Sequence, residues 1–105
     1  MNQKGLERTR LFEEWRQNCM MGDEGWQAYL VRSEAMRIRL IALGHTWESD
    51  RIAFEEIISG LSSDYDVSKT AMLSSENLTL DRIDTVLRAD DRERGRQRSR
   101  TSGEA

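Results

Sequence analysis

The sequence predicts an all-α protein, a compact bundle of about five short helices followed by a disordered basic C-terminal tail. Three observations favour helices. No proline occurs in 105 residues, where average usage predicts about five. The β-branched residues are few and are scattered among good helix formers such as Leu, Met, Arg and Glu. Apolar residues also recur at three- and four-residue steps, the spacing of one helix face.

The first helix is expected over residues 4–20. Its apolar face is formed by Leu11, Phe12, Trp15 and Cys19. Gly22 and Gly25 favour a turn that ends this helix. A second helix is expected over residues 26–43, with Gly44 as its C-terminal cap. Its broad apolar stripe, interpreted as the buried face, contains Trp26, Tyr29, Leu30, Met36, Leu40, Ile41 and Leu43.

The third helix begins after a capping oxygen from Thr46 or Ser49. Its apolar residues follow the spacing of an amphipathic helix up to a break at residues 60–63: Phe54, Ile57, Ile58 and Leu61. A short fourth helix is expected from the segment Ser63-Asp64-Tyr65-Asp66 to about residue 74.

The fifth helix has the best specified start. Thr79 is the expected N-cap, and Leu78 lies where a hydrophobic staple would contact Ile83. Asp81 in the first turn faces the positive end of the helix dipole. The expected buried stripe consists of Leu80, Ile83, Val86 and Leu87.

The charge is divided unevenly along the chain. Residues 92–105 hold five Arg against two Glu, a net +3, so residues 1–91 carry −6 of the total −3. The tail has no apolar side chain larger than its final alanine and is expected to be disordered. The predicted organisation is therefore a helical domain over 1–91 and a basic tail over 92–105.

No catalytic, cofactor-binding or metal-binding residues are predicted, and an enzyme is disfavoured. His45 is the only histidine, and Cys19 is interpreted as a small core residue and His45 as a loop residue rather than as a nucleophile and its base. These two residues are too few for a zinc site, and no glycine-rich phosphate loop is present. No small-molecule substrate is expected.

The chain has a single cysteine and begins without the apolar stretch of a signal peptide or membrane span. A cytoplasmic location without a membrane partner is therefore expected.

The tail arginines are the one feature that points directly to a partner. They alternate with small or polar residues and could neutralise RNA phosphates without reading sequence: Arg92, Arg94, Arg96, Arg98 and Arg100. The alternative is a solubilising end or a linker cut short.

Residues 15–94 resemble the capsid-forming region of the Gag polypeptide of copia-type long-terminal-repeat retrotransposons. The order and spacing of short motifs carry the resemblance: Trp15, Trp26-Gln-Ala-Tyr29-Leu30, Leu40 to Gly44, Ile57-Ile58-Ser-Gly-Leu61-Ser-Ser-Asp-Tyr65-Asp66, Leu78-Thr79-Leu80-Asp81-Arg-Ile83 through Leu87, and Arg92-Glu93-Arg94. The chain departs from the family at Ser62, where a proline is usual, and it lacks the zinc knuckle that commonly follows. It also begins close to the Trp helix.

The resemblance implies a retroviral-capsid-like helical domain that self-associates into homo-oligomers and packages RNA through its basic tail. Candidate interface residues are Trp26, Tyr29, Trp47 and Tyr65, with a core role as the alternative for each. The leading alternative function is a helical adaptor that binds a partner protein without an assembly or RNA role. An independent nucleic-acid-binding module is a third possibility, which the −6 body weakens by repelling phosphate.

Overall fold

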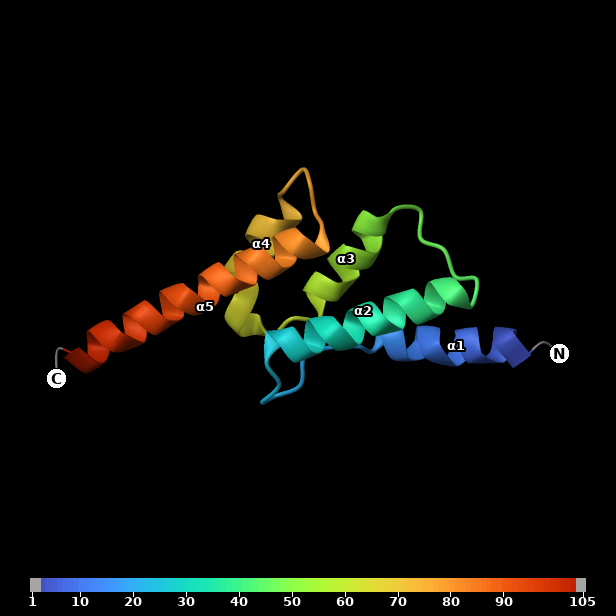
Figure 1. The fold of residues 1–105 in the computed structure, drawn as a ribbon, viewed down its shortest axis with the longest axis horizontal. Helices are drawn as coiled ribbons and strands as arrows, with labels where there is room; N and C mark the ends of the chain where they lie inside the picture. The colour runs from blue at the N-terminus through green and yellow to red at the C-terminus, as the bar shows by residue number, and fades with distance from the viewer. Residues whose placement is uncertain (1–2, 104–105) are drawn as a thin grey trace. The chain divides into compact units, whose positions relative to one another are not determined.

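The computed structural model describes the backbone of residues 3–103 and the side chains of residues 3–96. Within this range it contains five α-helices, one short 3-10 helix and no strand, so the all-α prediction is confirmed (Figure 1). The elements are α1 (Gln3–Arg16), α2 (Trp26–Ala42), α3 (Asp50–Ser59), η1 (Ser63–Tyr65), α4 (Asp66–Leu73) and α5 (Leu80–Gly103).

The helices fall into two units, Met1–Ser62 with α1 to α3 and Ser63–Ala105 with η1, α4 and α5. Each unit is described by itself below. The predicted division between a domain and a tail at residue 91 stays a prediction.

Helix α1 is shorter than the sequence predicts. It ends at Arg16, because the backbone and side chains that follow are used in contacts with other elements. The Met20 N–H donates to the Gly60 carbonyl at 2.8 Å, and the Asn18 amide donates to the Ser33 hydroxyl at 2.8 Å. Cys19 is exposed in this segment, so its predicted core position is wrong.

The C-terminus of α2 confirms the expected role of Gly44. Gly44 has φ +96°, a left-handed conformation that glycine adopts without strain. Its N–H donates to the Ile41 carbonyl at 3.0 Å, and the His45 N–H donates to the Leu40 carbonyl at 2.9 Å. These two bonds form a Schellman motif, which satisfies carbonyls that the helix end leaves unpaired.

The inner face of α2 supplies the core of the first unit. Trp26, Tyr29 and Leu40 are at most 2% exposed. The Tyr29 hydroxyl donates to the Ile57 carbonyl of α3 at 2.7 Å. Burial raises the pKa of this hydroxyl to about 12, so it stays a neutral donor at physiological pH.

Ile41 is 49% exposed, so its predicted place in the buried stripe is wrong. Ile41 lies at the edge of the buried face, turned by about 100° around the helix from the fully buried Leu40.

The second unit begins with the short turn η1, which leads directly into α4. Its core is formed by side chains from the two helices and their connections: Tyr65, Met72, Leu78, Ile83 and Leu87. The predicted cap of α5 is confirmed, because the Arg82 N–H donates to the Thr79 hydroxyl at 3.1 Å. Leu78 and Ile83 are both buried, as the hydrophobic staple requires.

Helix α5 continues past residue 92, where the sequence predicts a disordered tail, and it ends at Gly103. Local charge pairing supports the helix over residues 92–96. Arg94 lies one turn after Asp90 and binds it at 2.5 Å, and Arg96 pairs with Glu93 at 3.8 Å. Pairs at these spacings stabilise a helix without burying apolar surface.

Replacing Gly60 with alanine should strongly destabilise the first unit. A Cβ at this position would lie 2.8 Å from the Asn18 carbonyl oxygen and closer still to the Tyr29 hydroxyl. We expect the free energy of unfolding to fall by about 1–3 kcal/mol. Urea denaturation followed by Trp fluorescence measures this change. Gly22→Ala is the matched control, because nothing lies within 4 Å of its added methyl group, and an equal loss in both variants would contradict the packing argument.

Candidate self-association surface

The structure gives two of the four interface candidates a core position in the first unit. Trp26 and Tyr29 are 2% and 0% exposed, on the side of α2 that carries the packing with α3. Their side chains are therefore not available to a second molecule in this conformation.

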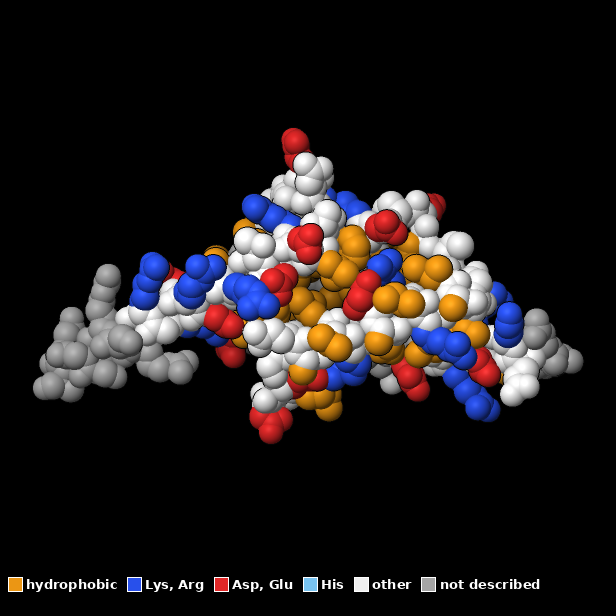
Figure 2. Space-filling model, in the orientation of Figure 1, with side chains coloured by type: hydrophobic (Ala, Val, Ile, Leu, Met, Phe, Trp, Pro, Cys, Tyr) orange, Lys and Arg blue, Asp and Glu red, His pale blue; other side chains and the backbone are white. Residues whose placement is uncertain are grey.

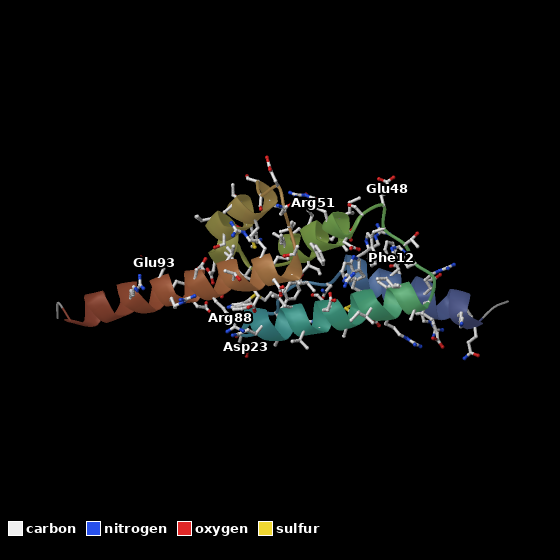
Figure 3. The ribbon with its side chains drawn as sticks, turned by 45° about the horizontal axis from the view of Figure 1, so that its top comes forward. Phe12, Asp23, Glu48, Arg51, Arg88 and Glu93 are labelled. Carbon is white, nitrogen blue, oxygen red and sulfur yellow. The ribbon has the colours of Figure 1, made fainter. Side chains whose placement is uncertain are left out.

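Trp47 is half-buried in the loop before α3 and belongs to an aromatic cluster. Its ring lies 5.2 Å from Trp15 and 4.4 Å from His45, and His45 lies 4.6 Å from Phe12 of α1, which Figure 3 labels. The Trp15 indole N–H also donates to Glu56 at 2.5 Å. The cluster joins α1 to the loop between α2 and α3, and it gives Trp47 a packing role.

Tyr65 is buried in the second unit, where Arg94 covers it. The Arg94 guanidinium lies 4.5 Å from the centre of the Tyr65 ring, a cation–π geometry. Arg94 also donates to the Asp64 carbonyl and to Asp90, and Asp90 accepts from the buried Ser68 hydroxyl at 2.6 Å. Arg94 thereby ties α5 to η1 and, through Asp90, to α4.

The tail arginines therefore differ in what they can offer to a phosphate. Arg94 is engaged by its own unit, and Arg96 is exposed and lies 3.8 Å from Glu93. Arg92 is exposed on α5. The side chains of Arg98 and Arg100 lie outside the part that the structure describes.

The largest departure from the sequence interpretation is a second apolar face on α2. Five apolar residues on this helix are exposed at spacings of 3, 4, 3 and 4 residues: Ala28, Val31, Ala35, Ile38 and Ala42. Val31 is 71% exposed and Ile38 is 57% exposed. At about 100° per residue the five positions fall within an arc of about 80°. We call this set the α2 seam, and Figure 2 shows apolar side chains reaching the surface where α2 lies.

Charged residues border the seam but do not enter it. Arg32 and Arg39 follow one edge, and Glu34 lies on the other. Each is paired within the first unit: Arg32 with Glu24, Arg39 with Glu7 at 3.0 Å, and Glu34 with Arg37 at 2.6 Å. The seam is therefore an apolar strip between charges that are already neutralised.

No family model, curated protein or solved structure matches the chain.

The Cys19 thiol is exposed, and the Cys19 backbone carbonyl accepts a hydrogen bond from Arg32 at 2.8 Å. His45 lies within the aromatic cluster. A hydrogen bond from the Met21 N–H and the Arg32 guanidinium lower the pKa of Glu24, so this carboxylate is the charged anchor of the turn after α1. Among the described residues, no group of three or more His, Cys, Asp or Glu side chains is placed to hold a metal ion. No described helix is long and apolar enough to cross a bilayer.

The second unit carries an open groove of about 650 Å³ between α4 and α5. Its lining combines apolar residues, Val67, Val86 and Ala89, with charged residues such as Asp64, Asp90 and Arg94. Val67 is 86% exposed.

The seam could have been found from the sequence, because its spacing is visible in residues 28–42. The signal was hidden by the stronger set of large apolar residues on the same helix. Three of the five seam residues are alanines, which carry little weight in a search for apolar stripes.

Arg94→Ala should loosen the second unit although Arg94 is a surface residue. The variant loses a charge-assisted bond to Asp90, a bond to the Asp64 carbonyl and the contact with Tyr65. We expect the free energy of local unfolding of the second unit to fall by about 1 kcal/mol, since the guanidinium is partly exposed. Hydrogen exchange of the amides in residues 63–96 measures this effect. Arg96→Ala is the control, and equal protection in the two variants would show that Arg94 has no special role.

Proposed function

We propose that this chain is a structural protein of the copia-type Gag capsid kind, which self-associates through its helical body and attracts RNA through basic residues of its C-terminal segment. The proposal places the assembly in the cytoplasm. It needs no catalytic residue, cofactor or small-molecule substrate. The observation that carries it is the α2 seam, an exposed apolar face on a helix whose opposite face is already buried.

The energetics favour covering this seam. Fully burying a valine or isoleucine side chain contributes about 1.5–3 kcal/mol relative to leaving it exposed. Val31 and Ile38 are both more than half exposed, and a symmetric contact would cover two copies of each. The gain is offset in part by the entropy lost on association. Repetition of one modest contact between identical copies is how symmetric assemblies form.

The RNA part of the proposal rests on a smaller set of arginines than the sequence indicates. Arg94 is held by Asp90 and Tyr65, so the proposal assigns phosphate contacts to Arg92, Arg96, Arg98 and Arg100. Residues 1–91 carry a net −6 and repel phosphate. The basic segment is therefore the part of the chain that suits RNA.

The alternative function, an adaptor that binds a partner protein, is favoured by the groove between α4 and α5. Its mixed lining of apolar and charged residues is the composition of a small interaction site. An adaptor of this kind would stay monomeric and would use Val67 rather than the α2 seam.

Self-association is tested with the double variant Val31→Glu, Ile38→Glu. For the wild-type chain, light scattering after size exclusion should show an average mass that increases with concentration. The two glutamates of the variant would be buried in the contact and should lower the association constant by about tenfold or more. Circular dichroism checks that the variant keeps its helices.

The matched control is Val67→Glu, because Val67 is the most exposed of the large apolar side chains in the described part. This variant should associate like the wild type. A wild-type chain that stays monomeric at every concentration would contradict the self-association proposal. If such a monomeric chain bound one partner protein, and Val67→Glu abolished that binding, the adaptor function would replace the self-association proposal.

RNA binding is tested with a variant that replaces Arg92, Arg96, Arg98 and Arg100 by glutamine and keeps Arg94, so that the second unit stays intact. Wild-type affinity for single-stranded RNA should fall with a log–log salt slope of about −2 to −3 for about four phosphate contacts. The variant should lose most of this affinity. A wild-type affinity independent of salt, or an unchanged affinity in the variant, would contradict the RNA role.

A further inference from the structure

We propose that the α2 seam pairs with the α2 seam of a second copy in antiparallel orientation, with Val31 opposite Ala42 and Ile38 opposite Ala35 of that copy. This inference rests on the proposed self-association and adds its surface, partner and register. It follows from three features: the spacing of the seam, the alternation of its side-chain size, and the half-exposed Ile41 at its edge.

The spacing of the seam is that of a two-helix contact. Steps of 3 and 4 residues keep the same side of a helix facing a partner helix over several turns. The seam spans residues 28–42, a length of about 21 Å at 1.5 Å per residue. All five of its side chains are exposed, so each keeps surface that a partner helix could cover.

The size of the side chains alternates along the seam. Alanine occupies positions 28, 35 and 42, and the larger Val31 and Ile38 lie between them. A parallel pair would place alanine opposite alanine and isoleucine opposite isoleucine, which leaves some layers empty and others crowded. An antiparallel pair can place a small side chain opposite a large one in every layer. Uniform filling is the favoured arrangement, because both voids and overpacking cost free energy.

Coverage of Ile41 selects between the two antiparallel registers that offer four such layers. With Val31 opposite Ala35, Ile41 lies level with residue 25, before α2 of the second copy begins, and stays uncovered. With Val31 opposite Ala42, Ile41 lies beside Glu34 of the second copy, whose methylene groups can cover this half-exposed side chain. The arginine edges tolerate this arrangement, because Glu24 and Glu7 neutralise Arg32 and Arg39 in each copy.

The extent of the seam predicts a weak pair. A contact of about 21 Å by one helix width of about 10 Å is smaller than the roughly 1,200 Å² interfaces of stable complexes. The pair should therefore form and dissociate with concentration. A repeated weak contact of this kind suits a reversible assembly better than a permanent dimer does.

Disulfide trapping tests the orientation. Two full-length single-cysteine variants, Val31→Cys and Ala42→Cys, are prepared with Cys19→Ser to remove the exposed native thiol, mixed in equal amounts and oxidised gently. In the proposed register the two copies of residue 42 lie about 16 Å apart along the helix axis, beyond the ~7 Å reach of a disulfide. The mixed 31–42 disulfide should therefore exceed either homodisulfide by about tenfold, instead of the twofold excess of random collisions.

Val67→Cys paired with Ala42→Cys gives the background of random collisions. Homodisulfides 31–31 and 42–42 in excess would show parallel pairing and overturn the proposed orientation. A further outcome is that light scattering shows dimers whose cross-linking does not exceed this background. That result would overturn the proposed seam pairing, and self-association through another contact would remain. Chains that are monomeric as well as uncross-linked would overturn both proposals.

Discussion

The hydrogen bond from the Tyr29 hydroxyl to the Ile57 carbonyl fixes α2 against α3, and the first unit is built around it. A buried hydroxyl needs a partner, so the bond sets the rotation of α2 about its own axis. The same junction admits no side chain at position 60, where the Gly60 carbonyl accepts from the Met20 N–H at 2.8 Å. Once α2 is held in this rotation, its seam has to face outward.

This constraint gives α2 two apolar sides with different roles. The inner side carries the large residues that fill the core, and the outer side carries alanines with one valine and one isoleucine between them. A helix that is apolar on opposite sides is normally covered on both. The proposal that a second copy covers the outer side follows from the sizes of the seam side chains. Small residues of one copy face large residues of the other only when the two α2 helices run antiparallel.

Arginine has two distinct roles in the second unit. Arg94 binds Asp90, the Asp64 carbonyl and the Tyr65 ring, and it extends the ordered helix beyond the last apolar residues of α5. Its neighbours on the same helix pair locally or face solvent. A count of positive charges therefore overstates what the segment can offer to RNA, and the assignment of phosphate contacts depends on which guanidinium groups the fold has already engaged.

The sequence by itself determined the all-α class, the cap at Thr79, the turn at Gly44 and most of the core, because these depend on local hydrogen bonds and on apolar spacing within one helix. The Gag resemblance and the function it implies stay predictions. Only the tertiary structure decided that Ile41 and Cys19 are exposed, that Trp26, Tyr29 and Tyr65 are buried, and that α5 runs past residue 92. Core and interface residues have the same chemistry, and only the rotation of each helix against its neighbours determines which of them remain exposed.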